Sequence, residues 1–179
     1  MGALATTASP VAAAEAADIR QYLTFALGSE MFAVGTLSVK EIIEYGHLTE
    51  VPMMPGFIRG VINLRGAVVP VIDLAARFGR NPTQITRRTC IVIIEVPTGE
   101  ERHDIGVVVD AVSEVLEIPA GEIEPAPAFG AKIRTDFIQG MGKVNGKFVI
   151  LLDVGKVLSV DEISTLASVA GQVPQAMAA

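Results

Sequence analysis

The sequence predicts an all-β protein built from two small β-barrels or curled sheets packed together. Short apolar runs rich in Val and Ile are separated by turns that contain Gly, which is typical of β-strands and hairpins. Prolines at positions 52, 55, 70, 97, 119, 125 and 127 interrupt the chain too often for long helices. A stretch near the middle of the chain recurs near its end, and this repeat indicates two similar halves.

Most of the predicted strands fall into hairpins. Gly28–Glu30 is a short connection containing Gly between the first two apolar runs. Asn145-Gly146, the dipeptide that most favours a type I′ turn, joins the last two. The predicted pairs are Gln21–Leu27 with Met31–Gly35, Phe57–Leu64 with Val68–Ile72 across Arg65-Gly66, Thr89–Val96 with Asp104–Val109 across the polar turn Thr98–His103, and Met141–Val144 with Phe148–Leu152.

Helices are expected to be few and short. Asp73 and Asp153 each follow an apolar strand and are typical N-caps, which predicts a helical turn after each of them. Ser159 with Glu162 forms a capping box before a helical pattern, which predicts a C-terminal helix. The expected segments are a disordered tail over 1–18, a folded domain over 19–160 with helical turns at Leu74–Phe78 and Val154–Leu158, and a C-terminal helix with a frayed tail over 161–179.

The internal repeat is the most informative feature of the sequence. With a shift of 80 residues, the segment 57–73 aligns with 137–153 with six identities, including two glycines and the final Asp. With a shift of 73, Val34, Val39 and Glu41 align with Val107, Val112 and Glu114. The different offset is accommodated by a longer, proline-rich connection over 119–136. Two similar halves of several short strands each imply two β-barrels or curled sheets.

Composition and motif content argue against several functional classes. The formal net charge is −6, and Arg87-Arg88 is the only adjacent basic pair, so we expect no nucleic-acid partner. No apolar run approaches a membrane span and no signal peptide is evident, which predicts a soluble, cytoplasmic protein without membrane insertion. Cys90, His47 and His103 suggest no catalytic triad or zinc site, and no phosphate-binding glycine loop occurs. We therefore expect no enzyme activity, metal or cofactor.

A few polar residues in apolar surroundings need an explanation. Asn63 and Arg65 surround the first repeat's hairpin turn, whereas the second repeat has ordinary turn chemistry over 143–146. Glu41 likewise lies among apolar residues, in the segment Val39-Lys40-Glu41-Ile42-Ile43. A solvated turn and a solvent-facing charge would explain these residues. Alternatively, they form a recognition surface that is apolar at its centre and polar at its rim, which favours a protein-binding role.

The segment 57–66, FIRGVINLRG, and the following VPVIDL at 69–74 closely resemble the signature of the chemotaxis coupling protein family CheW. The resemblance covers about residues 20–160 and includes Val39–Ile42, Gly106–Asp110 and the region 140–142. It implies two intertwined, five-stranded SH3-like barrels around a common apolar core. It also implies a scaffold without catalytic activity that links chemoreceptors to the histidine kinase CheA and is recruited to membrane-associated receptor arrays.

The resemblance further implies that the helical tip of a chemoreceptor lies in a groove between the two barrels. Aliphatic side chains would bury the apolar stripe of the helix while charged residues fix its register. The matching receptor-binding positions are Val39, Glu41, Ile42, Arg59, Gly60, Asn63, Arg65 and Gly106. The regulatory domain of CheA is expected to contact the barrel ends, at residues that the sequence does not assign. Arg59 stands where the family often has Lys, which changes its hydrogen-bond geometry.

Other functions stay open at this point. A CheW-like adaptor of a non-flagellar pathway, controlling pilus motility or a second messenger, would have the same sequence features. A small-molecule-binding β-barrel would need a deep polar pocket with convergent titratable groups.

Overall fold

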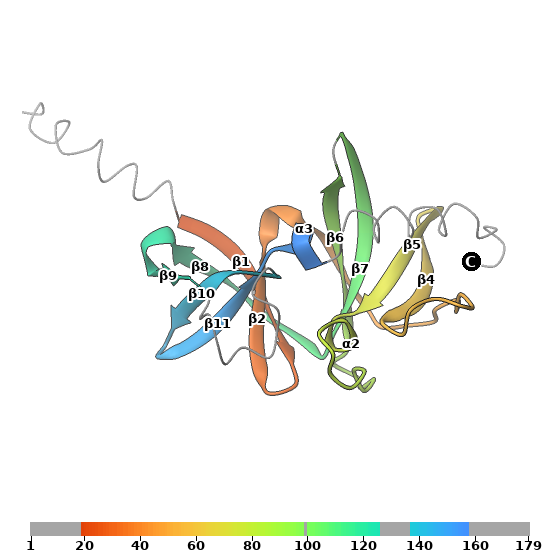
Figure 1. The fold of residues 1–179 in the computed structure, drawn as a ribbon, viewed down its shortest axis with the longest axis horizontal. Coiled ribbons are helices and arrows are strands. Elements are labelled where there is room, and N and C mark those ends of the chain that lie inside the picture. Colours follow the sequence, from red (N-terminus) through yellow and green to blue (C-terminus); the bar gives the residue numbers. More distant parts are fainter. Residues whose placement is uncertain (1–18, 99, 126–136, 158–179) are drawn as a thin grey trace, which may run out of the picture.

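The computed structural model describes residues 19–98, 100–125 and 137–157, and strands dominate it (Figure 1). The N-terminal half contains β1 (Ile19–Leu27), β2 (Glu30–Gly35), the 3₁₀ turn η1 (Thr36–Ser38), β3 (Val39–Glu44), β4 (Ile58–Leu64), β5 (Ala67–Asp73) and α2 (Leu74–Arg77). The C-terminal half contains β6 (Cys90–Thr98), β7 (Glu101–Val109), β8 (Ala111–Pro119), η2 (Ala120–Glu122), β9 (Ile123–Glu124), β10 (Ile138–Val144), β11 (Lys147–Leu152) and α3 (Val154–Val157).

The strands form two curled sheets that lie side by side along the long axis of the molecule (Figure 1). The first barrel has the strand order β8-β1-β2-β11-β10-β9, and the second barrel has the order β3-β6-β7-β5-β4. Each barrel therefore combines a hairpin from one half of the chain with strands from the other half. The chain crosses between the barrels through η1 and again at Asp110, so the two barrels are intertwined, as the sequence resemblance implied.

The predicted duplication is visible in the strand register. The hairpin β4–β5 shifts register between Ile58 and Gly60, and the hairpin β10–β11 shifts at the equivalent place, between Ile138 and Gly140. The parallel pairing of β5 with β7 in the second barrel has its counterpart in the pairing of β11 with β2 in the first. The two halves thus repeat both the strands and their irregularities.

The turns and caps that the sequence predicts are also present. Arg65 and Gly66 have φ angles of 54° and 86°, and Asn145 and Gly146 have 52° and 80°, as a type I′ turn requires. The Asp73 side chain accepts a hydrogen bond from the amide of Ala76 at the start of α2. In the second half, Asp153 Oδ1 accepts one from Gly155, 3.1 Å away, at the start of α3.

Some details differ from the prediction. The turn between β6 and β7 is tighter than Thr98–His103, because β7 already begins at Glu101 and pairs with β6 along its whole length. The first sheet contains six strands instead of five, since two-residue β9 joins its edge; an isolated bridge, Thr49 to Val61, adds to the edge of the second sheet in a similar way. The predicted C-terminal helix and both terminal tails lie outside the described residues.

Three buried apolar clusters hold the barrels together. One lies inside each barrel, and the largest spans both of them, with members such as Phe25 and Val107. A chain of aromatic rings crosses this shared cluster, with Phe25–Phe32, Phe32–Phe78 and Phe78–Phe137 centroid distances of 6.2, 5.8 and 5.9 Å. Burial of this shared surface makes the two barrels one cooperative unit.

Candidate functional site

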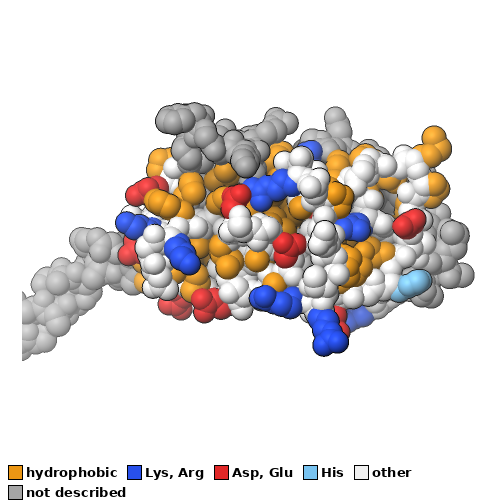
Figure 2. Space-filling model, turned by 90° about the horizontal axis from the view of Figure 1, so that it is seen from below, with side chains coloured by type: hydrophobic (Ala, Val, Ile, Leu, Met, Phe, Trp, Pro, Cys, Tyr) orange, Lys and Arg blue, Asp and Glu red, His pale blue; other side chains and the backbone are white. Residues whose placement is uncertain are grey.

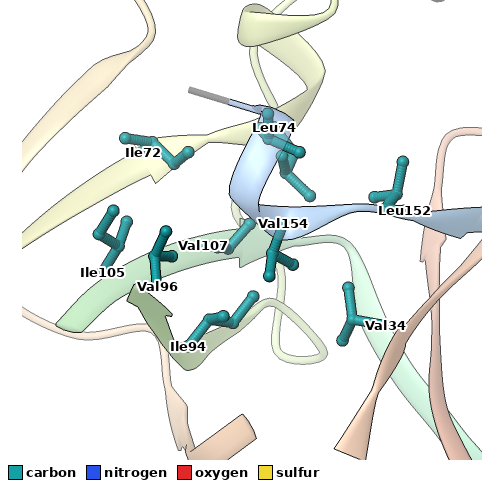
Figure 3. A pocket seen from close by; sticks show the side chains of 10 residues that line it. Val34, Ile72, Leu74, Ile94, Val96, Ile105, Val107, Leu152 and Val154 are labelled. Carbon is teal, nitrogen blue, oxygen red and sulfur yellow. The ribbon is translucent and has the colours of Figure 1, made fainter. Parts of the chain in front are cut away.

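The inner part of the junction between the two barrels is filled by the protein's own side chains. The residual cavity there has a volume of about 20 Å³, room for about one water molecule. Its labelled aliphatic side chains converge from both barrels and from the two short helices (Figure 3). The lining residues are Val34, Ile72, Leu74, Ile94, Val96, Ile105, Val107, Leu152, Val154 and Val157. This part of the junction is therefore core, and a helix could not enter it without opening the protein.

The two glycines among the predicted receptor-binding residues are buried in the second barrel. A Cβ atom on Gly60 would lie 2.4 Å from the backbone oxygen of Thr49, and the Gly60 φ angle of 149° also favours glycine. A Cβ on Gly106 would lie 2.8 Å from Ile91 Cγ2 and 3.1 Å from Val71 Cγ2. These two glycines therefore allow close packing between segments of this chain, and not the close approach of a partner.

Arg59, a further predicted site residue, is engaged with a buried carboxylate. Its Nε lies 3.0 Å and its Nη2 2.9 Å from Oδ2 of Asp73, whose side chain is 1 % exposed. Thr83 donates to the same carboxylate from its amide (2.9 Å) and its hydroxyl (3.1 Å), and its carbonyl accepts from Arg59. Arg59 therefore ties the loop after α2 to the start of β4, and its charge is compensated within the protein.

Glu41 and Arg65 are brought together by the curl of the second sheet. They lie 24 residues apart in sequence, on the edge strand β3 and at the β4–β5 turn, yet Arg65 Nη2 is 2.7 Å from Glu41 Oε2. The Arg65 side chain is 79 % exposed and that of Glu41 23 %. Asn63, also predicted, accepts a hydrogen bond from the Gly66 amide at 2.8 Å and so stabilises the turn that presents Arg65. This ion pair is the part of the predicted site that the structure assembles.

Exposed apolar side chains occur on β3 and in the segments that precede β3 and β4. Ile42 on β3 is 42 % exposed, whereas Val39 is half-buried against the shared core. Leu37, in η1 directly before β3, is completely exposed, as is Met53 in the loop before β4. No sequence pattern singles out Leu37 or Met53, because apolar residues beside a predicted strand are usually buried. Their exposure is a signal that only the folded chain provides.

A second group of charges surrounds the start of β3. The Lys40 ammonium lies 3.1 Å from Asp104 and 3.7 Å from Glu95, and Arg102 lies 2.9 Å from the other Glu95 oxygen. The hydrogen bond and charge of Asp104, and then the charge of Glu95, raise the pKa of Lys40, which stays protonated. The face in Figure 2 likewise shows basic and acidic side chains scattered among apolar ones. Such a mixed surface suits protein recognition.

The part of the chain that the structure describes offers neither a metal-binding cluster nor a membrane-spanning helix. No group of three or more His, Cys, Asp or Glu side chains there is placed to hold a metal ion. Within the same residues, no helix is long and apolar enough to cross a membrane.

Two intertwined β-barrels of this topology, with an exposed charged and apolar edge, define the chain as an SH3-like double-barrel scaffold domain. The model of the CheW-like domain family matches residues 21–162. This chain therefore belongs to the CheW family, whose members are scaffold proteins of chemotaxis without catalytic activity.

Individual relatives agree with this assignment. Chemotaxis protein CheW of Klebsiella aerogenes is 35% identical over 151 residues, which cover 84% of this chain and 89% of that protein. Protein FrzA of Myxococcus xanthus is 31% identical over 148 residues, 82% and 89% of the two chains. The crystal structure of scaffolding protein TtCheW from Thermoanaerobacter tengcongensis superposes with a TM-score of 0.72 and 33% identity, covering 80% of this chain and 90% of that one.

Proposed function

We propose that this chain is a chemotaxis adaptor that couples the cytoplasmic tips of chemoreceptors to the regulatory domain of the histidine kinase CheA, in arrays at the membrane. Kinase activity then follows receptor state while the adaptor itself catalyses no reaction. The observation that carries this proposal is the exposed edge of the second barrel, where Glu41 and the exposed Ile42 are neighbours on β3 and Arg65 reaches Glu41 from the β4–β5 turn. Family membership supplies the partner classes.

The receptor helix in this proposal runs along the edge of the second barrel instead of entering the filled junction. Arg59 and Arg65 mark the two ends of β4, about 20 Å apart at the rise of a β-strand. A helix of about 13 residues spans that length. Ile42 would pack against its apolar stripe, while Glu41 and Arg65 would fix its register through polar side chains. Gly60 and Gly106 support this surface from within, and Arg59 holds its far end in place.

The kinase contact needs a second surface, because one adaptor must hold both partners at once. Leu37 is suited to this role. It is fully exposed at the crossover between the barrels, and a large apolar side chain in that position gains by being covered. We assign the kinase contact to η1 and the receptor contact to β3 and the β4–β5 turn.

Calorimetric titration of the full chain with a receptor cytoplasmic fragment, and separately with the CheA regulatory domain, tests the proposal. Arg65→Glu places two like charges together and is expected to weaken receptor binding about tenfold. Its affinity for CheA should not change. Arg102→Glu is the matched control, because Arg102 is 73 % exposed and pairs with Glu95 at 2.9 Å in nearly the same way.

The outcomes are distinct. Binding of the wild-type chain to neither partner at tens of micromolar contradicts the adaptor function itself. Binding to both partners that is equally unaffected by Arg65→Glu and Arg102→Glu leaves the adaptor function standing and removes the Glu41–Arg65 pair from its receptor site.

A further inference from the structure

An open hollow at the junction of the two barrels takes no part in the receptor and kinase contacts proposed above. Its volume is about 980 Å³, at the upper end of the roughly 300–1,000 Å³ of ligand pockets. One wall is the loop between α2 and β6, and the other combines the β1–β2 turn with the crossover at Asp110 and Ala111. Neither β3, the β4–β5 turn nor η1 contributes to the described lining. We call this space the junction hollow.

Two arginines of the junction hollow stand on a fixed turn. The Thr89 amide donates to the Thr86 carbonyl at 3.3 Å, which closes a four-residue turn with Arg87 and Arg88 at its centre. The Thr86 amide also donates to Oγ1 of the buried Thr89 at 2.8 Å, and the Arg88 amide to Thr86 Oγ1 at 3.1 Å. Both arginine side chains are exposed, and neither forms an ion pair with a described residue. Their charges are therefore available to an anion.

The third arginine of the junction hollow, Arg80, is held from several sides. Its Nη2 lies 2.5 Å from Glu30 Oε1, and its guanidinium carbon lies 5.8 Å from the centroid of the Phe32 ring. Its Nη1 lies 3.9 Å from the place of a Cβ on Gly28, a residue of the opposite wall. A guanidinium carries several N–H donors, and among the described residues Glu30 is its only hydrogen-bond acceptor. Arg80 therefore joins the two walls and keeps donors for a ligand.

The junction hollow also contains a carboxylate and small apolar residues. Asp110 Oδ2 accepts a hydrogen bond from the Gly28 amide at 2.7 Å, which leaves Oδ1 as an acceptor for a ligand. Ala26, Ala75 and Ala111 belong to the lining as well. Three arginines against Asp110, with Glu30 beside Arg80, leave the site positively charged. A ligand that matches it has anionic groups at one end and hydrogen-bond donors on a less polar part at the other.

We propose that the junction hollow binds a nucleoside diphosphate. Arg87, Arg88 and Arg80 bind its two phosphates through charge-assisted hydrogen bonds, for which guanidinium groups are well suited. Asp110 accepts a hydrogen bond from the ribose or the base, and the alanines contact the ring. A bare inorganic anion would leave Asp110 unused and be repelled by it. Because the turn already fixes the arginine backbone, binding orders little of the protein, whereas the open walls keep the affinity modest.

Calorimetric titration of the full chain with ADP, pyrophosphate and adenosine, without divalent metal, tests this proposal. ADP is expected to bind with a dissociation constant below about 1 mM, and pyrophosphate and adenosine each several-fold more weakly. The double variant Arg87→Gln with Arg88→Gln should weaken ADP binding about tenfold or more. The matched control is Lys143→Gln with Lys147→Gln, which removes the same charge at exposed positions of the β10–β11 hairpin and should bind ADP as the wild-type chain does.

Asp110→Asn separates the two ends of the ligand. The new amide oxygen can still accept from Gly28, so the fold is kept, while the carboxylate is lost. ADP should then bind several-fold more weakly and pyrophosphate no more weakly than to the wild-type chain. Amide shifts in nuclear magnetic resonance spectra of the ADP-bound chain should be largest at Gly28 and at residues 86–89.

Several results would overturn the proposal. One is the absence of ADP binding at about 1 mM, and another is equal weakening in the Lys143→Gln, Lys147→Gln control. Pyrophosphate that binds as tightly as ADP, or loses as much affinity in Asp110→Asn, would exclude a nucleotide. Vesicles of anionic phospholipid that capture the chain through Arg87 and Arg88 while ADP does not bind would assign these arginines to a lipid headgroup. Since neither receptor nor kinase is present, failure here leaves the adaptor function unaffected.

Discussion

The hairpins β4–β5 and β10–β11 occupy corresponding places in the second and the first barrel. Both contain a register shift beside a glycine, both turn through two residues with positive φ, and both end at an aspartate that begins a helical turn. They differ at the other polar positions. Where the first copy has Arg59, Asn63 and Arg65, the second has Gln139, Lys143 and Asn145.

This comparison separates the residues that the fold requires from those that one barrel has acquired. Positions where the backbone leaves no choice are alike in both copies. Two of the three polar positions that differ carry ion pairs of the second barrel, Arg59 with Asp73 and Arg65 with Glu41. The duplicated fold therefore acts as an internal control, in which each change in the second barrel has a matched change in the first.

The largest difference in stability loss between matched substitutions of the two copies is expected at the aspartates Asp73 and Asp153. Asp73 accepts hydrogen bonds from Arg59, Thr83 and the α2 amide in a fully buried position. Asp73→Ala should lower the free energy of unfolding by about 3 kcal/mol, because it leaves the partly buried Arg59 charge without its partner. Asp153→Ala removes a partly exposed cap and should cost about 1 kcal/mol.

Urea unfolding of both variants beside the wild-type chain measures this difference through the transition midpoints. Equal losses in the two variants would show that the Arg59–Asp73–Thr83 network contributes no more than an ordinary helix cap.

The aspartates also show how far sequence reasoning reaches. Local signals identified Asp73 and Asp153 as caps, the glycine turns and the duplication, because each depends on neighbouring residues or on a repeated pattern. The Arg59 and Thr83 contacts with Asp73 depend on how a loop without a regular pattern folds back. The Glu41–Arg65 pair similarly exists only because the sheet curls and brings its edge strand to the β4–β5 turn.

Gly60 and Leu37 show that the site residues, too, can be predicted only in part from the sequence. The resemblance placed Gly60 at a partner surface, and the structure shows its missing side chain making room for Thr49 within the chain. Leu37 was not singled out at all, since an apolar residue beside a strand predicts burial. Whether a residue faces solvent depends on the packing of distant segments, which a single sequence does not encode in a local pattern.

A smaller difference in stability loss is expected between Gly60 and Gly140, the glycines beside the two register shifts. Gly60→Ala should lower the free energy of unfolding by about 3 kcal/mol, because the new Cβ meets rigid backbone at Thr49 and the φ angle of 149° strains any other residue. A Cβ at Gly140 would lie 2.6 Å from Ile123 Cγ2, a side-chain atom that can move, and its nearest backbone contact, the Glu124 carbonyl oxygen, is farther away at 3.0 Å. Gly140→Ala should therefore cost about 1 kcal/mol.

Denaturation midpoints of the two glycine variants check this order, with circular dichroism to confirm that each variant still folds. If Gly140→Ala proves the more damaging, the two-residue β9 is held more rigidly than the Thr49 bridge, and the assumption that Ile123 can yield is wrong.

The smallest difference concerns the two hairpin turns, and it can be tested by exchanging their residues. Arg65 has a φ angle of 54°, which Asn adopts more readily than Arg. Because the Glu41–Arg65 ion pair is largely exposed, it contributes little free energy to offset the unfavourable φ angle of Arg65. Arg65→Asn should thus raise the free energy of unfolding by about 0.5 kcal/mol and weaken binding of the receptor fragment. Asn145→Arg should lower the free energy of unfolding by a similar amount without changing receptor binding.

Unfolding midpoints and calorimetric titration of the same two preparations measure both effects. A loss of stability in Arg65→Asn would mean that the ion pair holds the barrel edge closed, so that Arg65 is retained for the fold and not for the partner.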